Sequence, residues 1–228
     1  MKSNLTVHLL LGLLLATVAC KPIYFETPQP KGGADIGFPA EFHGRYSIEG
    51  DTIWVDAKGY TISETKKGTY ALTDEESEMP GVNRLESPFG PGKKMTLPAE
   101  TGPEWLGYWT PKDDSVVYAL SRRVRTALNP DSAILRQAIK NTYLLNLRAD
   151  EGFWYTLQLR KASNGGIAVT WATEDEAEVA RKYFPLKEVK NDDGEISHYL
   201  ANPPAKKLIK FVQADGFAKP LMDLAPLP

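Results

Sequence analysis

Residues 142–171 read TYLLNLRADEGFWYTLQLRKASNGGIAVTW, a pattern that indicates the fold class of the protein. Three short runs rich in apolar, β-branched and aromatic residues, at 142–148, 153–160 and 167–171, are typical of strands. The polar segments between them end in glycine, which tight hairpin turns favour because their backbone needs positive φ. The stretch therefore predicts an antiparallel β-meander.

Alternation of polar and apolar residues also marks the N-terminal part of the chain. The alternating runs are separated by polar residues followed by glycine, which again indicates hairpin turns. The alternation itself indicates a sheet with one face exposed to solvent. We therefore predict an N-terminal β-meander over 38–79. Its strands are expected at 44–48, 52–56, 60–64 and 69–73, with turns at Glu49-Gly50-Asp51, Lys58-Gly59 and Lys67-Gly68.

The stretch 121–140 and the residues just before it fit two periodicities. Val117, Leu120 and Val124 lie on a helical stripe, yet the same residues also take part in a strand-like alternation. We favour strands, because β-branched and aromatic residues are frequent and Asn129-Pro130-Asp131 indicates a turn midway. A C-terminal meander is thus predicted over 115–228.

Residues 80–114 are predicted to be a proline-rich connection between the two meanders. Neither a strand nor a helix is expected to run far between prolines that are so closely spaced. Long segments of this kind are usually functional loops or interdomain connections. The prolines are Pro80, Pro88, Pro91, Pro98, Pro103 and Pro111.

An aromatic cluster, Glu104-Trp105-Leu106-Gly107-Tyr108-Trp109, lies within this connection. Trp105, Tyr108 and Trp109 could form a stacking platform for a sugar or an aromatic ligand. The simpler interpretation is that the three rings pack against one end of the neighbouring sheet and cover it. Both interpretations stay open at this point.

Two helices are predicted in the C-terminal part, near 173–184 and 203–214. Thr173-Glu174-Asp175-Glu176 has the spacing of a capping box, and Pro185 stops the first helix. Asp215-Gly216 ends the second. We therefore predict an α+β, β-rich protein of two consecutive antiparallel meanders, forming a small barrel or a sandwich, with two short helices.

Residues 1–19 have the pattern of a secretory signal peptide. Lys2 precedes a leucine-rich apolar run, and Ala19 is a small residue at its exit. Thr17-Val18-Ala19-Cys20 resembles the lipobox of bacterial lipoprotein signal peptides, which implies that Cys20 receives a lipid and becomes the first mature residue. The alternative is a plain signal peptide followed by an unpaired cysteine, a reactive group that secreted chains tend to avoid.

Residues 20–37, rich in proline and glycine, are predicted to form a flexible tether between the lipid and the folded part. Together with the lipobox, the segments Phe25–Pro30, Phe42–Tyr46 and Tyr199–Phe217 resemble a group of Gram-negative envelope lipoproteins to which no activity is attached. Phe42-His43-Gly44-Arg45-Tyr46 also resembles the first strand of lipocalin-type barrels. Because Lys21 follows the cysteine instead of an aspartate, we expect the outer membrane.

The charge balance makes nucleic acid an unexpected partner. The formal net charge of the chain is −2, and removal of residues 1–19 takes away Lys2 and no acid, so the mature chain would carry −3. Binding of a phosphate backbone needs a concentrated excess of lysine and arginine. The one basic concentration, Arg122, Arg123, Arg125, Arg136 and Lys140, could face anionic headgroups or a phosphorylated glycan, or could block strand edges.

Catalytic and metal-binding groupings are not apparent in the sequence. The mature chain has two histidines, His43 and His198, and its single cysteine is the lipid attachment residue. A cysteine nucleophile or a multi-histidine zinc site therefore lacks its residues. We expect no cofactor, no metal and no enzymatic activity.

The sequence thus predicts a lipid-anchored envelope protein that acts as a non-enzymatic binding or accessory module. Its expected partners are the membrane, through Cys20, and an envelope protein or a small ligand. One alternative is a lipocalin-like carrier of a small apolar ligand. A second is a glycan hydrolase with paired carboxylates, which needs two carboxyl groups about 5 to 10 Å apart across a cleft.

Overall fold

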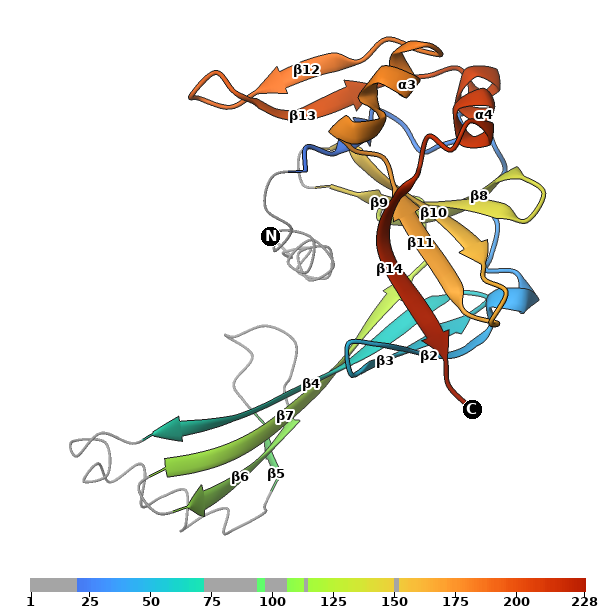
Figure 1. Cartoon of the computed structure of the whole chain (residues 1–228). Helices are drawn as coiled ribbons and strands as arrows, with labels where there is room; N and C mark the ends of the chain where they lie inside the picture. The colour runs from blue at the N-terminus through green and yellow to red at the C-terminus, as the bar shows by residue number, and fades with distance from the viewer. Residues whose placement is uncertain (1–19, 72–93, 97–105, 113–114, 150–151) are drawn as a thin grey trace. The chain divides into compact units, whose positions relative to one another are not determined.

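The computed structural model describes residues 20–71, 94–96, 106–112, 115–149 and 152–228 (Figure 1). Within these ranges the protein is β-rich, and its two α-helices, α3 (Ala177–Arg181) and α4 (Ala205–Gln213), lie in the C-terminal part. The predicted α+β class and both helices are therefore confirmed. The expected signal peptide, residues 1–19, lies outside the described residues.

The strands of residues 115–171 agree closely with the sequence prediction, whereas the strand at 219–226 was not predicted. β8 to β11 form the expected antiparallel meander, in which each strand pairs with the next. The stretch 121–140 forms strands, as predicted, and not a helix. In chain order the described strands are β1 (Ile23–Phe25), β2 (Gly44–Ile48), β3 (Asp51–Asp56), β4 (Gly59–Ala71), β5 (Lys94–Thr96), β6 (Leu106–Lys112), β7 (Ser115–Ala127), β8 (Ala133–Ile139), β9 (Thr142–Arg148), β10 (Trp154–Lys161), β11 (Ile167–Trp171), β12 (Lys187–Lys190), β13 (Ile196–Ala201) and β14 (Lys219–Pro226).

The described strands do not close into a barrel. Hydrogen-bonded neighbours follow the order β12-β13-β1-β10-β11-β14-β2-β3-β4-β7-β6-β5, while β9 pairs with β10 and carries β8 on its other edge. One edge of β10 is divided, because Trp154 pairs with β1 whereas residues 158–161 pair with β11. The sheet therefore branches at β10 and is open, which corrects the barrel alternative.

The chain forms two compact units that do not follow the predicted division into consecutive parts. Of the described residues, unit 1 contains those within Met1–Ile48, Trp54–Tyr60 and Arg125–Pro228, and unit 2 contains those within Glu49–Ile53 and Thr61–Val124. β2 pairs with β14 at the other end of the chain, so the first strands share a unit with the C-terminal meander. The boundaries predicted at 38–79, 80–114 and 115–228 are corrected accordingly.

Two further expectations for the N-terminal half are corrected. Residues 59–71 form one continuous strand, β4, where two strands and a turn at Lys67-Gly68 were expected. A Lys-Gly pair permits a turn without requiring one, and β4 has the equally long β7 as a neighbour. The predicted connection 80–114 contains β5 and β6, and Pro111 lies in β6 opposite Val116 of β7.

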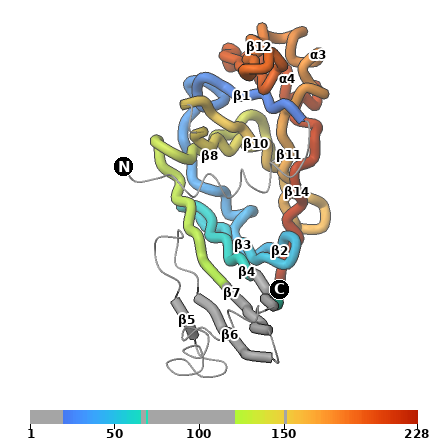
Figure 2. Tube along the Cα trace, turned by 90° about the vertical axis from the view of Figure 1, so that its left-hand side faces the viewer, coloured from blue at the N-terminus to red at the C-terminus, as the bar shows by residue number. Residues whose placement is uncertain are grey.

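The main core of unit 1 lies between one face of the sheet and the helices. It includes Phe25 of β1 and Trp154 of β10, which pack with residues of α3 and α4. The Phe211 ring of α4 lies 5.2 Å from that of Phe184 and 5.5 Å from that of Phe217. Figure 2 shows β1 between the helices and β10. The N-terminal strand is therefore part of the core.

The opposite face of β10 is also apolar. Tyr155, Leu157 and Leu159 alternate with the core-facing positions, and all three are buried. Val169, opposite Leu159, and Trp171 extend this face onto β11. The strand β10 is buried on both faces, and its alternate positions are Trp154, Thr156 and Gln158, of which the two polar ones are buried with hydrogen-bond partners.

Candidate functional site

The fold holds the chain from the first residue after Cys20. Three backbone hydrogen bonds join residues 21–23 to neighbouring segments, and β1 then pairs in parallel with β13. Cys20, the predicted lipid attachment residue, is therefore adjacent to hydrogen-bonded backbone. The three bonds run from Glu174 N to Lys21 O (2.8 Å), from Tyr199 N to Pro22 O (2.9 Å) and from Ile23 N to Ala172 O (3.0 Å).

The segment 20–37 is an integral part of unit 1, so the predicted flexible tether is corrected. The side chains of Ile23 and Phe25 lie in the main core, and Gln29 is 0% exposed. Proline and glycine suggested an unfolded linker, but the apolar residues at 23 and 25 alternate as in a strand. Their burial stabilises this segment by roughly 1.5–3 kcal/mol for each side chain.

Two ion pairs lie beside Cys20. Lys219 Nζ is 2.8 Å from Asp175 Oδ2, and Lys21 Nζ is 3.4 Å from Glu174 Oε2. The pKa of Lys219 is raised, first by the hydrogen bond to Asp175 and then by the neighbouring Cys20 sulfur. Each of the two lysines beside Cys20 is therefore matched by one carboxylate.

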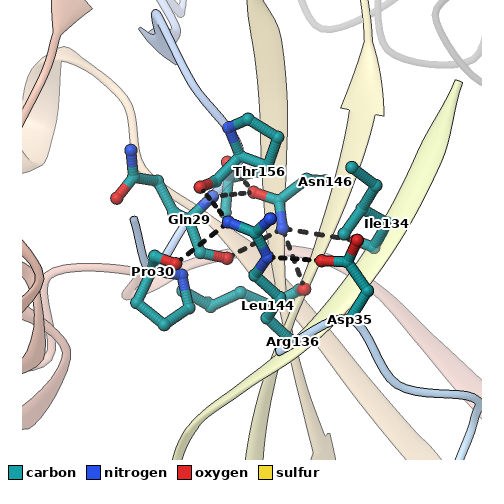
Figure 3. Close-up of polar contacts among 9 residues, drawn as sticks. Gln29, Pro30, Asp35, Ile134, Arg136, Leu144, Asn146 and Thr156 are labelled. Carbon is teal, nitrogen blue, oxygen red and sulfur yellow. Dashed lines mark hydrogen bonds and ion pairs between the residues drawn. The ribbon is translucent and has the colours of Figure 1, made fainter. Parts of the chain in front are cut away.

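A buried amide clamp fixes the segment after β1, as Figure 3 shows. Gln29 N donates to Asn146 Oδ1 at 2.8 Å, and Asn146 Nδ2 donates back to Gln29 O at 2.8 Å. The Thr156 hydroxyl donates to Asn146 Oδ1 at 2.9 Å. The Asn146 side chain therefore replaces a strand neighbour for the Gln29 backbone.

Arg136 of β8 provides a second clamp on the same segment. Its Nη1 donates to Pro28 O at 2.7 Å and to Pro30 O at 3.1 Å, and its Nε donates to Asp35 Oδ1 at 2.7 Å (Figure 3). One guanidinium thus satisfies two carbonyls and one carboxylate. Both clamps have structural roles, and the one polar atom of Gln29 that is buried without a hydrogen-bond partner in the described part of the chain is its Oε1.

A cluster of aromatic rings lies on the side of β1 and β10 that faces away from the main core. The Tyr155 ring is 5.6 Å from that of Tyr24 and 5.4 Å from that of Trp171. The His198 ring is 5.1 Å from Tyr24 and 6.0 Å from Phe153. His198 is therefore a packing residue, as expected, whereas His43 lies at the surface with its Nε2 2.8 Å from Phe38 O.

The Tyr155 hydroxyl is the notable polar group of this cluster. It is buried and has no hydrogen-bond partner within the described ranges. Burial raises the pKa of the Tyr155 phenol far above its ordinary value, and the nearby Tyr24 adds to the shift. An unsatisfied buried hydroxyl costs about 1–3 kcal/mol, so an acceptor placed there would gain from it.

The predicted stacking platform lies in a different unit from this cluster. Trp105 is outside the described residues. Tyr108 and Trp109 belong to β6, where they pair with Ala119 and Tyr118 of β7. The platform stays a prediction.

Most of the expected basic concentration is paired with distant carboxylates. Arg122 Nε lies 2.5 Å from Glu64 Oε2, with both side chains buried, and Arg125 Nη2 lies 2.7 Å from Asp56 Oδ1. Arg136 pairs with Asp35, as described above. The five cations therefore do not form one free basic surface, and pairing with remote acids explains three of them.

Within the described ranges, no cluster of three or more histidine, cysteine or acidic side chains is arranged to hold a metal ion. In the same part of the chain, no helix is both long and apolar enough to cross a membrane. No protein-family model matches the chain, and no curated protein or solved structure matches it significantly.

Sequence reasoning missed the residues of the clamps and of the Tyr155 cluster. Asn146 carried a usable signal, since it is the one polar residue between Tyr143 and Leu147 in an otherwise apolar run. Gln29 carried no such signal, because it lies between two prolines in a segment that resembles a linker. Tyr155 is indistinguishable in sequence from a residue of an ordinary core.

Proposed function

We propose that this protein is a lipid-anchored component of the bacterial cell envelope, attached through Cys20 to the outer membrane, and that it acts as a non-enzymatic binding or accessory module. The observation that carries the proposal is the apolar run ending in Thr17-Val18-Ala19-Cys20, directly before a body whose backbone bonds begin at Lys21. Cleavage before Cys20 would leave every hydrogen bond of β1 in place.

The lipid attachment is tested on protein purified from bacterial membranes. We expect the intact mass to exceed that of the chain beginning at Cys20 by the mass of a diacylglyceryl group and one further acyl chain. Labelled palmitate should enter the wild-type protein and should not enter the Cys20→Ser variant. A free thiol at Cys20 and recovery in the aqueous fraction would contradict the proposal.

The binding or accessory role is tested by photo-crosslinking from exposed positions of the body in intact cells. We expect a reproducible crosslink to an envelope component and an envelope defect when the protein is removed. A normal envelope together with the absence of any crosslinked partner would count against this role.

The aromatic cluster supports a second candidate, a carrier of a small apolar ligand. The rings of Tyr24, Tyr155 and Trp171 offer apolar contact, and the buried Tyr155 hydroxyl is available to an acceptor. Native mass spectrometry of the purified body should then detect a bound ligand that Tyr155→Phe binds more weakly. A wild-type protein that carries no ligand would eliminate this candidate.

A further inference from the structure

We infer that the lipid is attached to unit 1 without a flexible spacer, so that the rim around Cys20 lies against the phospholipid headgroups and unit 1 has a fixed orientation on the membrane. The rim consists of the two ion pairs beside Cys20, Lys21 with Glu174 and Lys219 with Asp175, together with the exposed Ala218 that precedes Lys219 in the sequence. This inference rests on the proposed lipidation of Cys20.

The first argument is the length of free chain. The Lys21 carbonyl already accepts the Glu174 amide at 2.8 Å, so Cys20 alone separates the lipid from bonded backbone. One residue spans at most about 3.6 Å. A flexible tether of 18 residues would instead allow an end-to-end distance of roughly 23 Å.

The second argument is the strength with which this segment is held. Pro22 forms a bridge with Thr173, and β1 pairs with both β10 and β13. Phe25 lies in the main core, and the clamps of Asn146 and Arg136 hold the chain beyond it. Release of the segment would therefore disrupt the core of unit 1.

The third argument concerns charge. Lys21 and Lys219 are each matched by a carboxylate, Glu174 and Asp175, within 3.4 Å and 2.8 Å respectively. A rim with balanced charge has little net attraction to anionic headgroups. The orientation should therefore depend on the short attachment, and added salt should not change it.

Fluorescence quenching on the full lipoprotein tests this inference. Because acylation consumes the Cys20 thiol, a cysteine introduced at Ala218 or at Ser163 is the single site for a fluorophore. Ala218 precedes Lys219 at the rim, and Ser163 lies in the turn beyond the other end of β11. Both residues are exposed. The vesicles contain phosphatidylethanolamine, phosphatidylglycerol and a lipid with a nitroxide on its headgroup.

We expect the Ala218→Cys label to be quenched at least about twofold more than the Ser163→Cys label, since the two positions differ by roughly 15 Å along β11. The ratio should be equal at low and high salt. A matched control inserts a Gly-Ser linker of about ten residues between Cys20 and Lys21, which spans roughly 17 Å and should remove the difference.

The outcomes separate this inference from the proposed function. Equal quenching at the two positions, in protein whose mass shows the lipid, would overturn the fixed orientation and leave the lipid anchor in place. A difference that disappears in high salt would also overturn it, because charge would then set the orientation. An unmodified Cys20 in the intact mass would overturn both.

Discussion

Asn146 is the residue that most directly ties the N-terminal segment to the meander. Its fully buried carboxamide donates to Gln29 O and accepts from Gln29 N, and it also donates to Ile134 O and Leu144 O at 3.2 Å. Buried backbone groups are almost always paired, because an unpaired group loses its hydration without compensation. The hydrogen bonds of the Asn146 carboxamide are therefore expected to contribute more to the stability of the fold than the volume of the side chain does.

Asn146→Leu is expected to lower the free energy of unfolding by about 2–5 kcal/mol, because it leaves the N–H and the carbonyl of Gln29 buried without a partner. The measurement is urea denaturation of the mature body carrying Cys20→Ser. The matched control is Thr156→Val, which removes one donor to Asn146 Oδ1 and should cost about 1 kcal/mol. Equal losses in the two variants would contradict the role given to Asn146.

Asp56 is the residue with the clearest acid-range titration. The hydrogen bond from Arg125, followed by that from the Lys58 amide, lowers the pKa of the Asp56 carboxyl from 3.8 to about 2. Because the folded-state pKa is depressed, the stabilisation is fully present above pH 3.8 and is lost as the pH falls towards 2. The pair is exposed, so its effect on overall stability is small.

Titration of Asp56 by NMR should therefore give a pKa of about 2, and Arg125→Gln should move it towards 3.8. Arg160→Gln is the control, because Arg160 pairs with Asp215 and should leave the Asp56 titration unchanged. An Asp56 pKa that is insensitive to Arg125→Gln would show that the backbone amides cause the shift.

At the scale of elements, β1 is the strand whose role differs most from the sequence prediction. It is only three residues long, yet two of them lie in the main core. Periodicity is weak evidence over so few residues, and the flanking prolines are typical of linkers. The parallel partner of β1, β13, lies some 170 residues further along the chain, a pairing that no local pattern indicates.

Phe25→Ala is expected to destabilise the body by about 3–5 kcal/mol, because it opens a cavity among Phe217, Trp154 and their neighbours. Urea denaturation checks this value. Glu26→Ala, at the adjacent exposed position, removes one exposed hydrogen bond from Asn202 Nδ2 and should cost no more than about 1 kcal/mol. If Phe25→Ala behaved like Glu26→Ala, residues 20–37 would be a tether after all.

The long strands and the helices show which elements a sequence predicts well. The strands at 142–148 and 167–171 agree with β9 and β11, and the Thr173 capping box forms as expected. Each depends on a local pattern of side chains. The continuity of β4 through Lys67-Gly68 was missed because the turn signal there is overridden by a neighbouring strand, β7.

At the scale of the whole molecule, every residue of the main core belongs to unit 1. A chain in which Glu64 is joined to Arg122 through an Asn-Gly turn removes most of unit 2 and retains the Glu64–Arg122 ion pair. We expect this chain to unfold cooperatively, with a Tm within about 5 °C of the parent, because its main core is unchanged.

Thermal unfolding followed by circular dichroism measures this outcome. The control deletes residues 23–30, which removes β1 and Gln29 and should abolish cooperative unfolding. A shortened chain that fails to unfold cooperatively, although it keeps the main core, would show that unit 1 does not fold by itself.

Local sequence patterns account for the β-rich class, for most strand and helix positions, and for the resemblance of the Cys20 region to a lipoprotein signal, because alternation, turn residues and capping act over a few neighbouring residues. Three features could be seen only in the folded protein: Ile23 and Phe25 lie in the core, β2 pairs with β14, and Arg122, Arg125 and Arg136 pair with carboxylates far along the chain. These contacts form only when strands and charged residues that are far apart in the sequence come together. Their free energy therefore depends on the complete fold and not on any local segment.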